Sequence, residues 1–338
     1  IQYFTGSKEH NVRLREMAIK KGMKINEWGV YKIKGEKEEK VAGDTEESVY
    51  AAMGLAWMPP EMRENHGELD WALEHFKIEN RKSKIENNFI QVSDMRGDLH
   101  MHTTASDGAC SIEEMVAEAK RRGYQYIAIT DHSKSQFQAN GLKADRLIEH
   151  IAAIHAVAKN AAKSGMLVLA GSEVDILADG SLDYEDDLLE KLDWVVASPH
   201  AALTQESDPA TQRLIRAISN PHVCVIGHPT GRLVPTRRGL EPDMEKVIFA
   251  AARNGVALEI NAHYYRLDLR DTHARLAVKA GVPLCINTDA HGLGDFDMMK
   301  YGIVTARRAW AKPENVLNAW PLEQLKKWLK GRKEMASF

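Results

Sequence analysis

Over residues 96–338, short apolar runs alternate with amphipathic stretches of helical period. Each run has the length of a buried strand, and Gly or a capping residue separates it from its neighbours. Strands alternating with helices form parallel βαβ units of one hand. Seven units predict an α/β fold, a distorted seven-stranded (β/α)7 TIM-like barrel, with an open doubly wound sheet as the alternative. The predicted strands are 98–102, 126–130, 167–171, 194–197, 223–226, 257–260 and 284–287.

Helix boundaries in this region have clear signals. Ser111 and Glu114 form a capping box, and Gly123 ends the helix that they begin. Asp243 and Asp271 open two later helices. These signals support regular strand–helix alternation.

The first 76 residues follow a different pattern, which predicts a small α+β domain. Residues 10–21 have helical spacing, and residues 24–33 alternate before a charged run at 36–40, which suggests a hairpin. Residues 77–95 are polar and mixed in charge, and are expected to form a linker.

The composition gives no bulk signal for nucleic acid or an acidic membrane. The chain has 338 residues, 44% of them hydrophobic and 28% charged, and a net charge of −3. No apolar run is long enough to span a membrane and no leader is recognisable, so we expect no membrane partner. Three scattered cysteines suit reduced thiols, and we predict a cytoplasmic protein.

Metal-competent side chains follow every predicted strand. His100 and His102, two residues apart on an extended segment, point to one face. Barrel enzymes place their sites at the carboxyl ends of strands, so we expect the donors to meet at one mouth. The predicted metal ligands are His100, His102, Asp107, His132, Glu173, His200, His228, Asp289 and His291. Five of them are predicted to be catalytic: His100, His102, Glu173, Asp289 and His291.

Nine donors are too many for one zinc ion, which takes three or four protein ligands. We therefore expect two or three divalent ions, and imidazole with carboxylate suits Zn²⁺, Mn²⁺ or Fe²⁺. Clustered ions activate a shared water and neutralise a phosphoryl transition state, so phosphate-ester hydrolysis is the favoured reaction. Basic and aromatic residues on the same loops are candidate substrate contacts through phosphates or stacking. The predicted substrate-binding residues are Lys134, Arg232, Arg237, Arg238, His263 and Arg266.

The N-terminal sequence resembles the thumb of a family X DNA polymerase. Tyr3, Phe4 and Gly6 match positions that line the sugar pocket of the incoming nucleotide in that family, and Asn11 and Arg15 match positions that face the base pair and template. The alternative is that the two aromatic residues are plain core. The polymerase palm of that family would lie upstream, so this chain alone is not expected to polymerise DNA.

From residue 96 the strand-end motifs resemble the PHP (polymerase and histidinol phosphatase) superfamily, whose fold is a distorted seven-stranded barrel with a trinuclear zinc or manganese site. The resemblance assigns the nine donors to that metal site. The motifs are 98–103, 130–132, 171–175, 198–200, 227–229 and 287–291. The chain departs from the close family at His263 and is longer at 234–236.

A thumb followed by a PHP domain implies a metal-dependent 3′→5′ exonuclease of a DNA-repair polymerase, with 3′-phosphatase or abasic-site cleavage in some relatives. The expected partners are single-stranded or gapped DNA 3′ ends and the palm and fingers of the full-length protein. Two alternatives stay open: a small-molecule phosphomonoesterase of the histidinol-phosphatase type and a non-catalytic DNA-binding module.

Overall fold

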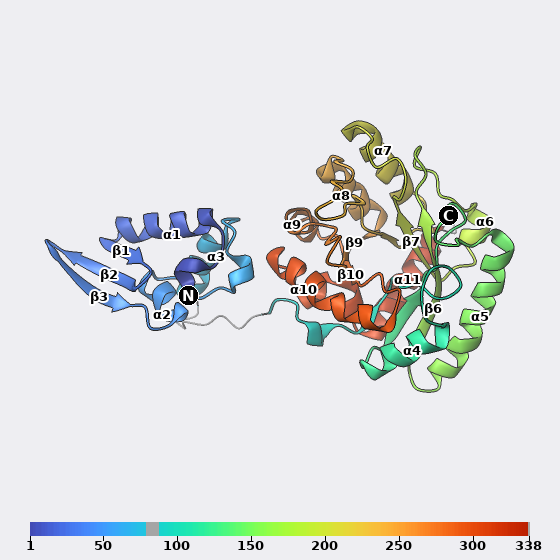
Figure 1. Cartoon of the computed structure of the whole chain (residues 1–338), viewed down its shortest axis with the longest axis horizontal. Helices are drawn as coiled ribbons and strands as arrows, with labels where there is room; N and C mark the ends of the chain where they lie inside the picture. Colours follow the sequence, from blue (N-terminus) through green and yellow to red (C-terminus); the bar gives the residue numbers. More distant parts are fainter. Residues whose placement is uncertain (79–87, 337–338) are drawn as a thin grey trace. The chain divides into compact units, whose positions relative to one another are not determined.

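The computed structural model describes residues 1–78 and 88–336. The chain divides into two compact units, Ile1–Asn88 and Phe89–Phe338, which we describe separately (Figure 1). Most of the predicted linker, residues 79–87, lies outside the described residues. No described helix is long and apolar enough to cross a bilayer.

The N-terminal unit packs helices against one antiparallel sheet of order β1-β2-β3. The segment predicted as one alternating strand is itself a hairpin, because Asn26 and Gly29 pair across a tight turn, and the charged run forms the third strand. The strands are β1 (Met23–Asn26), β2 (Gly29–Lys34) and β3 (Lys37–Ala42). The helices are α1 (Lys8–Lys20), α2 (Glu46–Ala52) and α3 (Glu68–Ile78), with 3₁₀ turns at Gln2–Phe4 and Pro60–Met62.

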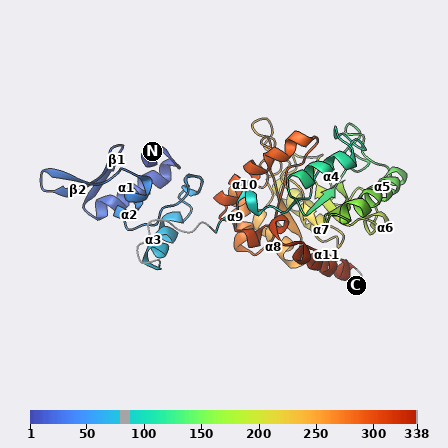
Figure 2. The same ribbon diagram turned by 90° about the horizontal axis from the view of Figure 1, so that it is seen from below.

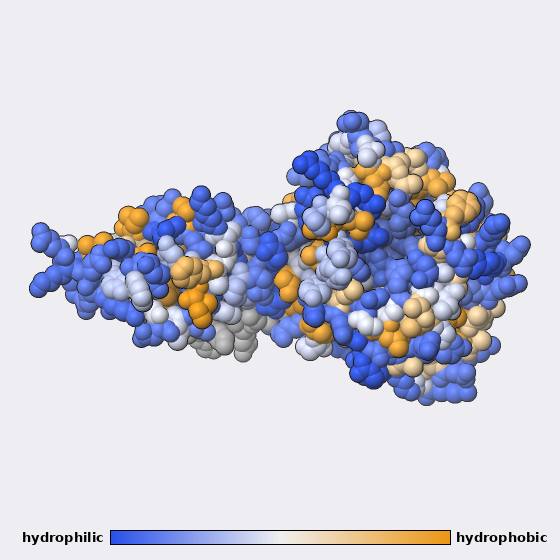
Figure 3. Space-filling model, in the orientation of Figure 1, coloured by the Kyte–Doolittle hydropathy of each residue, from blue (hydrophilic) through white to orange (hydrophobic). Residues whose placement is uncertain are grey.

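The core of this unit is apolar, with Leu14, Val30 and Tyr50 fully buried. Phe4 is 79% exposed, so the alternative of plain aromatic core is wrong for this residue. Figure 3 shows hydrophobic surface beside the N-terminus marked in Figure 1. Asn11 holds the first turn by donating from Nδ2 to the carbonyl oxygens of Thr5 and Ser7.

The C-terminal unit is the predicted α/β barrel, with helices around a seven-stranded parallel sheet (Figures 1 and 2). Its strands are β4 (Gly97–Asp98), β5 (Tyr126–Ile129), β6 (Leu167–Asp175), β7 (Trp194–Ser198), β8 (Val225–Ile226), β9 (Ala257–Asn261) and β10 (Leu284–Asn287). Its helices are α4 (Ile112–Arg121), α5 (Ala144–Ala162), α6 (Asp186–Leu189), α7 (Ser207–Ile218), α8 (Met244–Asn254), α9 (Asp271–Lys279), α10 (Met299–Arg308) and α11 (Leu322–Ala336). Short 3₁₀ turns cover Val92–Asp94, Leu293–Met298, Pro313–Asn315 and Leu317–Ala319.

The sheet runs in sequence order from β4 to β10 and nearly closes on itself. A parallel bridge joins Met101 to Ala290, and the backbone N–H of His102 donates to the Ala290 carbonyl oxygen at 2.8 Å. The first and last strands are therefore neighbours, and the open doubly wound alternative is wrong.

Two strand boundaries differ from the sequence prediction. Only Gly97–Asp98 of the first strand joins the ladder, because side chains take over the next donors: Leu99 N–H donates to Asn287 Oδ1 and Met101 N–H to Thr130 Oγ1. The third strand continues past residue 171, since Gly171–Asp175 keeps pairing with β7. Glu173 therefore lies within a strand, not after it.

The two ends of the barrel have different chemistry. Leu325 and Trp328 of α11 pack in one apolar cluster with Trp194, the first residue of β7. This helix closes the amino-terminal end of the strands. The carboxyl ends carry the polar side chains, as the barrel architecture predicts.

Candidate metal centre

Three strand ends at the barrel mouth carry ligand candidates. His100 and His102 follow β4 and are completely buried on its inner face. Asp289 and His228 follow β10 and β8 with φ of +55° and +25°, in the left-handed region that side chains rarely adopt. Such strain is typical of functional sites, where the surrounding structure maintains it.

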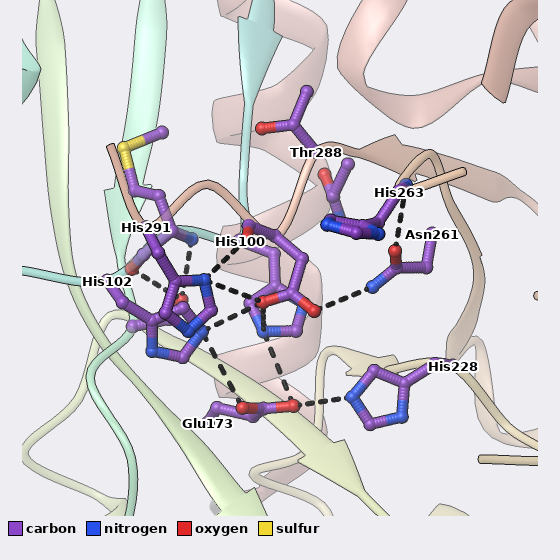
Figure 4. A network of polar contacts seen from close by, with 12 residues as sticks. His100, His102, Glu173, His228, Asn261, His263, Thr288 and His291 are labelled. Carbon is purple, nitrogen blue, oxygen red and sulfur yellow. Dashed lines mark hydrogen bonds and ion pairs between the residues drawn. The ribbon is translucent and has the colours of Figure 1, made fainter. Parts of the chain in front are cut away.

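Glu173 is the centre of the cluster and contacts five imidazoles. Its Oε1 lies 2.8 Å from His228 Nε2 and 3.3 Å from the Nε2 atoms of both His100 and His200. Its Oε2 lies 2.8 Å from His132 Nδ1 and 3.7 Å from His102 Nε2. Figure 4 shows His100 and His228 pointing toward this carboxylate. A carboxylate with imidazoles around both oxygens is suited to bridge two metal ions.

Two further carboxylates complete the group. Asp289 Oδ1 lies 3.0 Å from His102 Nε2. Asp107 Oδ2 lies 3.4 Å from His291 Nε2 and 3.6 Å from His132 Nε2. The structure thus brings all nine predicted donors together at one mouth. Eight of them form three sets whose ligand atoms lie within 4.8 Å of one another: His102, Asp107, His132 and His291; His100, His102 and Asp289; and His132, Glu173 and His200.

Several buried atoms of this cluster lack a hydrogen-bond partner within the described residues. They include His102 Nδ1 and His228 Nδ1. An unsatisfied buried polar atom costs about 1–3 kcal/mol, so native proteins rarely keep several together. The donor set of imidazole nitrogens and carboxylate oxygens fits Zn²⁺, Mn²⁺ or Fe²⁺. The residues present therefore fit a multinuclear metal site.

The charges of the cluster shift its pKa values strongly. Burial alone would raise the pKa of Glu173, but the surrounding imidazoles, His200 first, outweigh it and hold that pKa well below its ordinary value. Burial and the charges of His132 and His291 lower the pKa of His102 to about 4. Burial would also lower the pKa of His200, but the Glu173 and Asp175 carboxylates raise it to about 9. Metal binding here would displace protons, since ligands must be deprotonated.

Supporting residues surround the donors, and sequence reasoning missed the most important one. Glu259 accepts a hydrogen bond from His100 Nδ1 at 2.8 Å and another from the His228 backbone N–H at 2.7 Å. Asp175 lies 2.6 Å from His200 Nδ1. The sequence signal that could have identified Glu259 is its position as the one acidic residue in the otherwise largely apolar strand Ala257–Asn261.

Two further aspartates, Asp98 and Asp131, hold the backbone of the site. Asp98 accepts hydrogen bonds from the backbone N–H and hydroxyl of Thr288. Asp131 accepts from Thr103 and lies 2.7 Å from His150 Nε2 on α5. His150, which the sequence analysis did not place in the site, therefore supports the site through its contact with Asp131.

The predicted substrate contacts lie in different environments. Arg266 is closest to the metal ligands, with Nε 3.4 Å from Asp289 Oδ2. Arg232 donates from Nε to the Arg266 carbonyl oxygen at 2.8 Å and from Nη2 to that of Leu267, so it braces a loop.

The remaining candidates lie at the rim. Arg237 and Arg238 are exposed, and Arg237 Nε donates to the Gly231 carbonyl oxygen. Lys134 is exposed above the Tyr184 ring. His263 is half-buried, and its backbone N–H donates to Asn261 Oδ1 (Figure 4).

Comparison with known proteins agrees with the two-unit architecture. Residues 1–64 match the family model of the DNA polymerase beta thumb, and residues 98–263 match that of the PHP domain. The DNA polymerase/3′-5′ exonuclease PolX of Bacillus subtilis (strain 168) is 43% identical over 330 residues, covering 98% of this chain and 55% of that protein. The chain thus spans about half the length of this relative.

One further relative and one solved structure are also similar to part of this chain. A probable phosphatase of Thermoanaerobacter sp. (strain X514) is 32% identical over 70% of this chain and 95% of that protein. The structure of histidinol phosphate phosphatase from Lactococcus lactis, complexed with zinc, L-histidinol and phosphate, is 18% identical, covers 64% of this chain and 94% of its own, and has a TM-score of 0.49. This last likeness is too weak to bear on function.

Proposed function

The chain belongs to the PHP family and carries a DNA polymerase beta thumb ahead of its PHP domain, and from this we propose that it hydrolyses phosphodiesters at the 3′ ends of DNA. The observation that carries the proposal is the group of nine nitrogen and oxygen donors at the barrel mouth, six of which are buried. The resemblance that the motifs indicated is confirmed for both parts of the chain.

We propose that the nine donors hold two or three divalent ions, Zn²⁺ or Mn²⁺, with Fe²⁺ as a further candidate. When bound, such ions lower the pKa of a coordinated water toward neutrality and stabilise charge on a phosphoryl group. Glu173, whose imidazole neighbours hold its pKa well below the ordinary value, contacts His100 of one set of ligands and His132, which belongs to the other two. His100, His102, Asp289 and His291 complete the catalytic group.

The chain's own cations bind the DNA backbone in this proposal. Arg266 lies at the metal centre, while the exposed side chains of Arg237, Arg238 and Lys134 bind phosphates further along the strand. Arg232 contributes through the loop that it braces. His263 contacts the terminal nucleotide.

The thumb points to a larger assembly. In the relative of about twice this length, the printed name joins a DNA polymerase to a 3′-5′ exonuclease. We propose that this unit works beside an upstream palm and fingers on single-stranded or gapped DNA in the cytoplasm. Removal of 3′-phosphates and cleavage at abasic sites are related reactions that the same site would support.

The direct test is digestion of 5′-labelled single-stranded DNA in the presence of Mn²⁺. A ladder of products shortened from the 3′ end is expected, and its loss in the Glu173→Gln variant assigns the reaction to this site. The exposed Glu245→Gln variant on α8 is the matched control and keeps the ladder. Absence of any shortened product from metal-loaded wild type would contradict the proposal.

A small-molecule phosphomonoesterase is the second candidate. The probable phosphatase relative, 95% of which is covered by this chain, favours it. Turnover of histidinol phosphate with DNA left intact would establish this reading. Tight DNA binding without metal-dependent cleavage of either substrate would instead indicate a binding module.

A further inference from the structure

A pocket of about 490 Å³ opens beside the metal centre at the barrel mouth. Val234, from the loop after β8, lines it together with His263 and Tyr265, from the loop after β9. Asp289 and His291 belong to the same lining, so the pocket is continuous with the metal ligands. Its volume lies in the range of small-molecule sites.

Aromatic rings dominate one wall of this pocket. The His263 ring stacks on that of Tyr264, with centroids 4.8 Å apart and planes 22° apart, and on that of Tyr265, at 5.5 Å and 24°. Both tyrosines are about half exposed, at 46% and 50%. Nearly parallel, solvent-exposed rings offer a ready face to another flat ring.

Hydrogen bonds fix this wall relative to the reacting centre. The Val234 backbone N–H donates to the Tyr265 carbonyl oxygen, which joins the two loops. The His263 backbone N–H donates to Asn261 Oδ1, and Asn261 Nδ2 donates to Asp289 Oδ2, each at 3.0 Å. The aromatic wall is therefore linked to a metal ligand through one side chain.

Arg266 supplies a cation at the inner end of the pocket. Its Nε lies 3.4 Å from Asp289 Oδ2, and its Nη1 is buried without a hydrogen-bond partner in the described part of the chain. A guanidinium nitrogen left unpaired at a pocket floor is suited to a phosphate oxygen.

We propose that this pocket binds the unpaired base of the 3′-terminal nucleotide, stacked on Tyr265 and His263, with Arg266 donating to that nucleotide's phosphate. This inference rests on the proposed function and adds the part of the substrate that the enzyme recognises. Base–aromatic stacking tolerates any sequence, because every base has a π face. The pocket thus selects 3′ ends whose last base is free to leave a duplex.

The test compares two single-stranded oligonucleotides that differ only at the 3′ end, one with an ordinary thymidine nucleotide and one with an abasic nucleotide. Both keep the same phosphodiester, so only the base changes. Wild type is expected to remove the ordinary nucleotide with a kcat/KM about 10-fold or more above that for the abasic one. Tyr265→Ala should lose this discrimination, and Tyr265→Trp should retain it.

Phe249→Ala is the matched control, because Phe249 is also an exposed aromatic residue, lies on α8 and does not line this pocket. It should keep the wild-type ratio. Equal wild-type rates on the two ends, or a Tyr265→Ala variant that still discriminates, would overturn the inference. Failure of the proposed function is distinct, since metal-loaded wild type would then release nucleotide from neither substrate.

Discussion

The Nδ1 atom of His100 lies 2.8 Å from Oε1 of Glu259, and both side chains are completely buried inside the barrel. An ionised carboxylate only accepts, so the imidazole must carry its proton on Nδ1. In the neutral imidazole that a metal ligand needs, the lone pair is then on Nε2, the atom that faces Glu173 and Asp289. Glu259 thus sets both the tautomer and the orientation that a metal ligand needs.

Removal of this carboxylate should weaken metal binding. Glu259→Ala is expected to lower metal affinity by about 10- to 100-fold, as typically found when a ligand loses its supporting hydrogen bond. Glu259→Gln keeps one acceptor oxygen, so its metal affinity should lie between that of Glu259→Ala and that of wild type. Titration with Mn²⁺, monitored by calorimetry, measures the affinity. Unchanged affinity in a folded Glu259→Ala variant would show that His100 needs no such support.

The barrel and its donors could be predicted because two periodic signals coincide. Apolar runs mark the strands, and a histidine or carboxylate follows each one, so topology alone brings distant donors such as His100 and Asp289 together. The metal ligation itself stays a prediction. The supporting role of Glu259 was not predicted, because a single acidic residue in an apolar strand forms no periodic pattern. Its partner, His100, is 159 positions away in the sequence.

Local boundaries were harder to predict, because side chains replace backbone partners. The strand expected to reach His102 leaves the ladder after Asp98, since Asn287 and Thr130 accept the next N–H groups. Such a substitution depends on residues far along the chain. In the N-terminal unit, the alternation of apolar and polar residues over 24–33 predicted one strand. The turn between Asn26 and Gly29 divides this segment into two strands.

Metal removal should destabilise the barrel without unfolding it, because its large apolar core does not depend on the ions. A free metal concentration of 100 times Kd is expected to add about 2.7 kcal/mol to the free energy of unfolding. For a unit of this size, that corresponds to about 5–10 °C in Tm. Differential scanning calorimetry with and without a chelator measures the shift. The same Tm under both conditions would contradict a tightly held metal centre.

Arg63 should be essential to the N-terminal unit. Its guanidinium is completely buried and donates to both carboxylate oxygens of Glu46, at 3.0 and 2.9 Å, and to the Met58 carbonyl oxygen. Arg63→Ala leaves that carboxylate without its charged partner and is expected to cost about 3–5 kcal/mol. Arg13→Ala breaks the exposed pair with Asp70 and should cost less than about 1 kcal/mol. Hydrogen exchange of α1 amides measures the loss of stability in each variant. Equal losses in Arg63→Ala and Arg13→Ala would show that the buried ion pair contributes no more than the exposed one.

Glu68 should make the stability of the N-terminal unit depend on pH. Burial would raise the pKa of its carboxyl group, but His10 and backbone N–H donors, including that of Asn65, outweigh burial and lower it. A carboxyl group with a lower pKa in the folded chain binds fewer protons there, so stability rises with pH. The contribution is complete above the ordinary glutamate pKa of about 4.3 and is lost as the pH falls through the folded value.

Glu68→Gln cannot titrate at this position and should therefore flatten the acid limb of the stability profile. The measurement is hydrogen exchange of α1 amides between pH 3 and 6, corrected for intrinsic exchange rates. Glu16→Gln, an exposed change on α1, should keep the wild-type slope. If Glu68→Gln and wild type lose stability in parallel on acidification, the dependence arises from other carboxyl groups, and the buried contact between Glu68 and His10 is not its source.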